Sequence, residues 1–134
     1  MKKYDNFVKC LDVLQKADRE QAHKDDIYRT GVIGQFNLVF ELAWKALQQV
    51  LRENGVQGAE NGSPREMLKL GYKYGMLDDE AVWRDMLKKR NLSVHIYNEE
   101  NADEIIDLIF DTYITGFYNL KNKLSVKISE LDGN

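Results

Sequence analysis

Four residues that can handle phosphate groups or protons lie close together in one short stretch: Arg90, Asn91, His95 and Tyr97. Histidine, with an unperturbed pKa of about 6.5, can take a proton at neutral pH. Arginine presents a planar fork that fits phosphate oxygens and keeps its proton. These types suit metal-free RNA cleavage, in which a base deprotonates the ribose 2′-OH and a cation stabilises the phosphorane. Asn91 could orient either group, and Tyr97 could bind a phosphate or a base.

This chemistry requires the chain to bend between Arg90 and His95. Residues five apart on one α-helix point about 140° away from each other. Three consecutive basic residues ending at Arg90 suit the last turn of a helix, and Asn91 suits its end. The next helix start is signalled at Asn101. We therefore expect an irregular turn over 92–100 that folds His95 back towards Arg90.

Arg90 stands where an apolar residue is expected. The inward-facing positions Trp83 and Leu87 continue to Arg90 at helical spacing. A guanidinium packed against a protein surface needs a partner, because an unpaired buried charge is costly. That partner could be a carboxylate, a second protomer or a phosphate.

A purely structural interpretation also accounts for these residue types. Basic residues complement the dipole at a helix end, and a single histidine in a turn is common. Ser93 lies too near His95 in sequence to suggest a nucleophile–base pair. His95 and Glu99 form a metal-binding face only if their segment is helical. We expect no metal ligand and no cofactor.

The composition restricts the class of protein. The chain has 134 residues, enough for one domain spanning 1–134, with 43% hydrophobic and 31% charged residues. Cys10 is the only cysteine, which argues against a disulfide or a multi-cysteine zinc site. No signal peptide and no membrane span are expected, so we predict a cytoplasmic protein without membrane contact. The net charge of −3 argues against a broad nucleic-acid groove.

Helical periodicity runs along nearly the whole chain and predicts an all-α, up-and-down bundle of four to five helices. The polar stretch KADREQAHKDD is interpreted as a turn, in which His23 is a solvated side chain. The acidic residues of 103–111 are interpreted as helix-start and solvent-facing carboxylates. The expected helices cover about 4–14, 26–54, 63–74, from 79 onwards, and 101–124.

Local signals mark several helix ends. Ser63 and Glu66 form a predicted capping box, as do Asn101 and Glu104. Within the longest helix, Gly31 and Gly34 each weaken the helix by about 1 kcal/mol relative to alanine. We interpret both glycines as positions where another backbone passes close by.

The segment RNLSVHIY resembles the signature of toxin-like HEPN domains, in which an arginine and a polar residue precede His-x-Tyr. FNLVFELAWKALQQVL (36–51), SPREML, YGML and VWRDML resemble the nucleotidyltransferase substrate-binding branch of that superfamily, which includes the HepT-like toxins. The resemblance spans about residues 4 to 124. One position departs from the family pattern, which has glutamate where this chain has Asn37.

The resemblance implies a bundle that forms a homodimer, with the arginine and histidine of both protomers facing a shared cleft. It also implies a metal-independent ribonuclease that cuts tRNA or mRNA. Arg90 and His95 would be catalytic and Asn91 supporting. A small nucleotidyltransferase, acting as antitoxin, would silence the enzyme by transferring AMP to Tyr97.

Two other hypotheses remain open at the level of sequence. The chain could be a non-catalytic substrate-binding subunit of a nucleotidyltransferase complex, in which Arg90 grips a phosphate. Alternatively, the cluster could be a polar patch between the subunits of a dimer.

Overall fold

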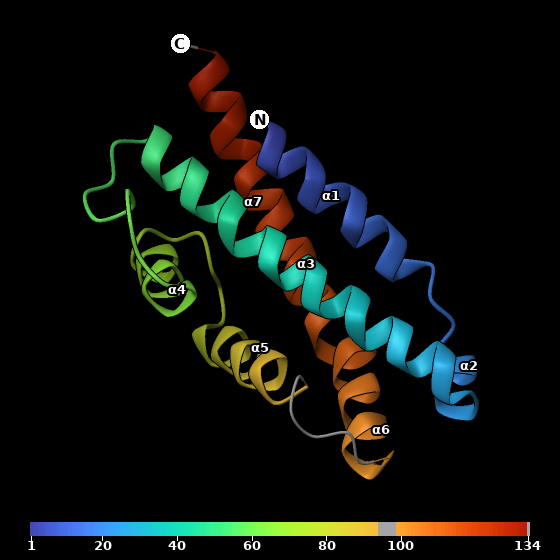
Figure 1. Cartoon of the computed structure of the whole chain (residues 1–134). Helices are drawn as coiled ribbons and strands as arrows, with labels where there is room; N and C mark the ends of the chain where they lie inside the picture. The colour runs from blue at the N-terminus through green and yellow to red at the C-terminus, as the bar shows by residue number, and fades with distance from the viewer. Residues whose placement is uncertain (94–98, 134) are drawn as a thin grey trace.

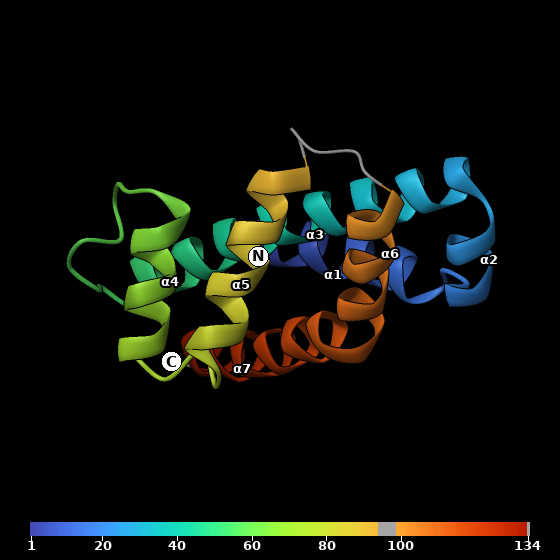
Figure 2. The same cartoon turned by 90° about the horizontal axis from the view of Figure 1, so that it is seen from below.

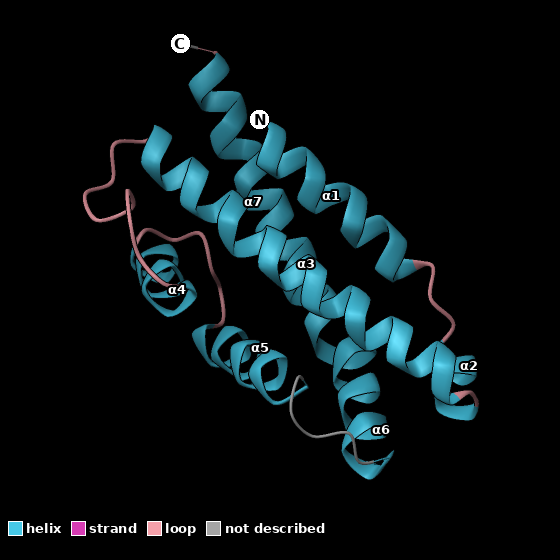
Figure 3. Ribbon diagram, in the orientation of Figure 1, coloured by secondary structure: helices cyan, strands magenta, loops and turns pink. Residues whose placement is uncertain are grey.

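The computed structural model describes residues 1–93 and 99–133, with side chains for 1–91 and 101–133. His95 and Tyr97 therefore lie outside the described residues. The described residues form helices and loops (Figure 3), which confirms the all-α prediction. The elements are α1 (Lys2–Gln15), α2 (Arg19–Lys24), α3 (Asp26–Glu53), α4 (Pro64–Lys73), α5 (Glu80–Ser93), α6 (Glu99–Leu108), the π-helix η1 (Ile109–Tyr113) and α7 (Ile114–Asp132).

The helices form two groups that cross each other. The long helices α1, α3 and α7 lie side by side and contact one another in all three pairs (Figure 1). Seen from below, α4, α5 and α6 stand in a row across the direction of α3 and α7 (Figure 2). Helix α3 contacts each of the other α-helices, and so forms the central support of the bundle.

An aromatic cluster joins the two groups of helices. The rings of Phe36 on α3 and Tyr113 on η1 stack with centroids 5.2 Å apart. Trp83 on α5 meets Phe117 on α7 edge to face at 5.6 Å. Each such pair contributes about 1 kcal/mol beyond the area it buries. The cluster therefore fixes α5 against α3 and α7, and this sets the direction in which α5 carries Arg90.

Several sequence-predicted features are confirmed. The long helix covers Asp26–Glu53, close to the expected 26–54. Ser63 caps α4 by accepting a hydrogen bond from the Glu66 backbone N–H, and its hydroxyl donates to the Glu66 carboxylate. Trp83 faces the core with an exposure of 2%, and Leu87 is partly buried and packs against the core.

The interpretation of KADREQAHKDD as a turn is wrong. Residues Arg19–Lys24 form the short helix α2, capped by Asp18, whose carboxylate accepts from the Gln21 backbone N–H. Only Ala22 of this helix is buried, so its sequence shows no apolar stripe. Contacts with distant acidic residues, described below, hold the helix in place.

The last helical segment also differs from its prediction. Helix α6 begins at Glu99, so Asn101 lies inside the first turn and does not stand at the N-cap position. The expected single helix is interrupted by η1, where Ile109 and Tyr113 are buried. Figure 2 shows the chain changing direction there, so α6 does not continue the line of α7. π-Helical turns are a recognised cause of such bends.

Among the described residues, no helix is both long enough and apolar enough to cross a membrane.

Candidate functional site

Arg90 is anchored to the central helix. Its Nη2 donates to Oε2 of Glu41 on α3 over 2.7 Å, and its Nη1 lies 3.3 Å from Oδ1 of Asn91. The Arg90 and Glu41 side chains are 32% and 28% exposed, so the ion pair is half-buried. Such a pair is held more firmly than one on the open surface. Among the partners considered for Arg90, the carboxylate is the one observed within the protomer.

Glu41 has a second cationic neighbour. Its Oε1 lies 3.6 Å from Nζ of Lys45, which stands four residues later on the same helix, a spacing that favours such pairs. Asn37, where the family pattern has glutamate, lies one turn before Glu41 on the same face of α3. The carboxylate that contacts Arg90 in this chain is Glu41, four residues after Asn37.

Helix α5 extends beyond its predicted end. It continues to Ser93, two residues past Asn91, so Arg90 and Asn91 both belong to the last turn of a regular helix. Helix α6 begins at Glu99, and both α5 and α6 contact α3. The structure thus brings Arg90 and Asn91 together beside Glu41. His95 and Tyr97 lie outside the described residues, so their predicted roles remain predictions.

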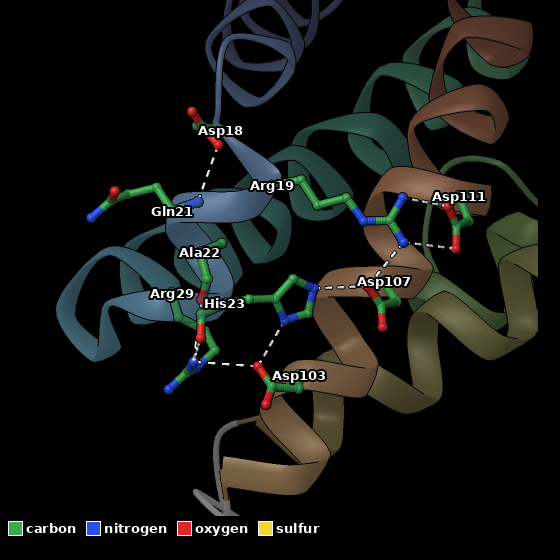
Figure 4. Close-up of polar contacts among 9 residues, drawn as sticks. All are labelled: Asp18, Arg19, Gln21, Ala22, His23, Arg29, Asp103, Asp107 and Asp111. Atoms are coloured by element: carbon green, nitrogen blue, oxygen red, sulfur yellow. Dashed lines mark hydrogen bonds and ion pairs between the residues drawn. The ribbon is translucent and has the colours of Figure 1, made fainter.

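A charged network holds α6, the helix that follows this segment, against α2 (Figure 4). His23 places Nδ1 2.9 Å from Oδ1 of Asp103 and Nε2 2.8 Å from Oδ1 of Asp107. Arg19 donates to Asp107 over 2.9 Å and to Asp111 over 2.6 Å. Arg19 and His23 therefore bridge three successive carboxylates spaced four residues apart.

Arg29, at the start of α3, completes the network. It is 5% exposed, and its Nη1 donates to the backbone carbonyl groups of Ala22 and His23 and, over 3.3 Å, to Asp103. Its Nη2 also pairs with Asp26. This buried guanidinium ties α2, α3 and α6 together at a single point.

The network favours the charged forms of its members. Hydrogen bonding to Asp103, together with Asp107, raises the pKa of the His23 imidazole above its ordinary value. Because carboxylates only accept hydrogen bonds, an imidazole between two of them donates from both nitrogens and carries a positive charge. Hydrogen bonds from Arg19 and His23 lower the pKa of Asp107. The interpretation of His23 as a solvated side chain is therefore wrong, whereas Asp103, Asp107 and Asp111 are partly exposed, as expected, and in addition bind His23 and Arg19.

Sequence reasoning missed the partners that complete these sites. Nothing in the local sequence linked Glu41 to Arg90, because their contact spans 49 residues of sequence. Asp103, Asp107 and Asp111 share one helix face by their spacing, but their partners Arg19, His23 and Arg29 lie 74 to 92 residues away in sequence. A regular acidic row opposite an isolated His–Arg cluster is the signal that could have linked them.

The fold and the Arg90–Glu41–Asn91 group define a helical bundle with an anchored cation at the end of α5. The chain belongs to the family described as nucleotidyltransferase substrate binding protein like, whose model matches residues 2–126. This match confirms the resemblance to the substrate-binding branch.

Individual relatives agree with this assignment. The chain is 24% identical over 106 residues to a Haemophilus influenzae protein named probable ribonuclease HepT, covering 78% of this chain and 73% of the relative. A crystal structure from Thermus thermophilus matches with a TM-score of 0.76 and 30% identity, over 88% of this chain and 98% of that one. A structure from Haemophilus influenzae, described as revealing the fold of a substrate binding domain of a nucleotidyltransferase, has the same fold, with a TM-score of 0.70 and 22% identity over 92% of this chain and 94% of that one.

Proposed function

We propose that this protein is a HEPN-type endoribonuclease that cleaves RNA without a metal ion, with Arg90 and His95 as catalytic residues and Asn91 as a supporting residue. The observation that carries the proposal is the half-buried Arg90, anchored by Glu41 and Asn91. A guanidinium fixed in this way is preorganised for phosphate, since its orientation does not have to be created during the reaction. The similarity to a protein named probable ribonuclease HepT supports the same reaction.

In this mechanism His95 removes the proton from a ribose 2′-OH. The 2′-oxygen attacks the adjacent phosphorus, and Arg90 stabilises the negative charge that gathers on the phosphorane oxygens. The bond from phosphorus to the 5′-oxygen then breaks, and the leaving oxygen takes up a proton. The products are a 2′,3′-cyclic phosphate and a 5′-hydroxyl, and the electrons balance without an oxidant or a metal.

The partner in this proposal is a small nucleotidyltransferase that acts as an antitoxin. It transfers AMP from ATP to the hydroxyl of Tyr97 and releases pyrophosphate. The new phosphodiester carries a negative charge seven residues from Arg90, where it opposes binding of an RNA phosphate. The family description, which refers to nucleotidyltransferases, supports such a partner.

The exposed face of α3 supports the homodimer that the family resemblance implies. Ile27 is 87% exposed and Leu38 is 45% exposed, and Gly31 and Gly34 lie between them on the same face. A side chain built at either glycine would meet nothing within 4 Å in this protomer. The smooth stripe therefore allows close approach of a helix from a second copy.

The same stripe points to the candidate site. The spacing from Ile27 through Leu38 continues to Glu41 after three more residues, on the same face of the helix. A symmetric dimer that buries the stripe would place two Glu41–Arg90 pairs near its axis. This supports a cleft to which both protomers contribute.

The alternative function is that of a non-catalytic substrate-binding subunit, and the description of the family favours it. In that role Arg90 binds a phosphate of the partner's substrate, and the isolated chain does not cut RNA. Glu41 and Asn91 would orient the cation in both cases. Only an activity measurement separates the two functions.

The decisive experiment is cleavage of tRNA and mRNA pools by purified protein in excess EDTA, beside His95→Ala. Mass spectrometry first verifies that the preparation carries no AMP. The proposal expects cleavage by the wild type alone, with 2′,3′-cyclic phosphate ends. Absence of cleavage from AMP-free protein would overturn it in favour of the binding subunit.

A further inference from the structure

A hollow of about 230 Å³ lies between α4 and α5, away from the contact of Arg90 with Glu41. Its apolar residues, Leu68 and Leu87, lie between cationic side chains from both helices. One carboxylate, Glu80, belongs to the same lining. The lining is Arg65, Leu68, Lys69, Glu80, Arg84 and Leu87.

Three cations line this hollow, Arg65, Lys69 and Arg84, and Lys88 lies one helical turn beyond Arg84. Arg65 and Lys69 are four residues apart on α4, and Arg84 and Lys88 are four residues apart on α5. All four are exposed, and within the described part of the chain none of their side chains forms an ion pair or a hydrogen bond. Like charges at this spacing destabilise a helix by a few tenths of a kcal/mol. The two charges within each pair therefore repel each other and weaken their helix. Binding of an anion between them would relieve this repulsion.

Paired cations elsewhere in the protein make the contrast plain. Lys123 is bonded to Asp78, and Lys89, next to Lys88 in sequence, lies 3.8 Å from Asp85. The chain is acidic overall, with a net charge of −3. Four cations on two neighbouring helices, with Glu80 as the carboxylate of the hollow, are therefore a local concentration of positive charge, suited to a narrow polyanion rather than to a broad charged surface.

The row leads to the candidate catalytic site. Arg84, Lys88 and Asn91 lie on one face of α5 at spacings of four and three residues. Asn91 is itself in contact with Arg90 through the 3.3 Å hydrogen bond. At 1.5 Å per residue, this face extends about 10 Å from Arg84 to Asn91. A strand lying along it would bring one of its phosphates to Arg90.

From this geometry we infer that the α4–α5 hollow binds backbone phosphates of the single RNA strand next to the phosphate that is cleaved, an inference that rests on the proposed ribonuclease function. Arg65 and Lys69 on one side and Arg84 on the other pair with phosphates at the hollow, and Lys88 pairs with the next phosphate towards Arg90. Leu68 and Leu87 offer an apolar floor against which a base or ribose packs. The site gives affinity without reading sequence, because backbone contacts are the same for every nucleotide.

The test measures binding apart from cleavage. The probe is a fluorescently labelled, single-stranded RNA with 2′-O-methyl groups throughout, which lacks the attacking hydroxyl. Its binding to the full chain is followed by anisotropy at several salt concentrations. The paired variants are Arg65→Gln/Lys69→Gln and Arg84→Gln/Lys88→Gln. The matched control is Lys2→Gln/Lys9→Gln, which removes two exposed cations from α1.

We expect each paired variant to bind the probe about tenfold more weakly than the wild type. Two lost phosphate contacts should also reduce the slope of log K against log salt by about 1.4. The control should bind like the wild type. Thermal unfolding of all variants should match the wild type or lie slightly higher, because the removed charges repel one another.

Failure of the inference is separable from failure of the ribonuclease proposal. If the wild type cuts RNA while both paired variants keep wild-type affinity and salt slope, the hollow does not bind the strand. If the wild type does not bind the probe at all, the inference is likewise overturned. If the wild type binds the probe and the paired variants lose affinity as expected, but no RNA is cut, the hollow is an RNA-binding site and the ribonuclease proposal fails.

Discussion

Glu41 and Arg90 are joined by a 2.7 Å hydrogen bond between Oε2 and Nη2, which connects the middle of α3 to the last turns of α5. Because α3 is the central helix of the bundle, this contact fixes the catalytic cation of the proposed enzyme to the most firmly supported element. The carboxylate also neutralises a half-buried charge while no substrate is bound.

Replacing Glu41 by Gln should lower RNA cleavage by about 10- to 100-fold, because a misplaced guanidinium loses much of its stabilisation of the transition state. Single-turnover cleavage at saturating protein measures the effect. Lys45→Gln is the control, since it removes the neighbour of the other oxygen, Oε1, and leaves Arg90 in place. A Glu41→Gln enzyme with the wild-type rate would show that the contact serves stability alone.

Replacing Tyr97 by Phe should remove the acceptor of AMP and leave cleavage unchanged. Incubation with the partner nucleotidyltransferase and ATP should then add one AMP to the wild type and none to the variant. In cells, the variant should remain toxic when the partner is present. If the Tyr97→Phe variant still receives AMP, the modified residue is a different one. If the unmodified variant does not cleave RNA, Tyr97 takes part in catalysis.

Replacing Gly34 by Lys should convert the proposed dimer into monomers. The protomer has open space for the new side chain, and removing a glycine from a helix interior stabilises the helix by about 0.5–1 kcal/mol. The variant should therefore sediment as a monomer yet unfold at the same or a higher temperature. Val126→Lys, at a 58% exposed site on α7, is the control and should keep the wild-type mass. A dimeric Gly34→Lys protein would place the interface elsewhere.

The contribution of His23 to stability should depend on pH. Its pKa is raised in the folded state, so protonated His23 stabilises the fold fully below about pH 6.5, and this contribution is lost as the pH rises through the higher folded value. The pKa of Asp107 is lowered, so its contribution is lost only as the pH falls below about 4.

His23→Ala should therefore cost about 1 kcal/mol near pH 5.5 and much less near pH 9, a modest value because the site is partly exposed. Thermal unfolding of wild type and variant across this range measures the difference. Lys24→Gln is the control, since its pair with Glu20 is largely exposed and should not change stability. An equal loss at both pH values would mean that His23 acts through packing and not through its charge.

The longest helix and the first capping box could be predicted from sequence because their signals are local. The apolar stripe of α3 and the Ser63–Glu66 pair each lie within one element and need no distant partner. The burial of Trp83 followed from the same periodicity. Where spacing alone decides the outcome, prediction and structure agree closely.

The predictions that failed depend on contacts between distant segments. Helix α2 buries only Ala22, and its place is fixed by Asp103 and Asp107 from the other half of the chain. No spacing within KADREQAHKDD reveals those partners. For the candidate site, Arg90 and Asn91 could be predicted from their residue types. The role of Glu41 could not, because its contact with Arg90 depends on how α3 packs against α5.

The orientation of α6 relative to α7 depends on how many residues the π-helical turn at Ile109–Tyr113 contains, and not on which residues they are. A wide turn of this kind holds more residues than an α-turn, so deleting Asp111 would restore the ordinary repeat. Each residue of an α-helix advances the angle by about 100°. The deletion would therefore rotate α6 relative to α7 and turn the carboxylates that face His23 in another direction. The rotation of α6 about its axis relative to α7 thus depends on the one extra residue in this turn. Relatives that lack one residue at this point are expected to have α6 rotated relative to α7.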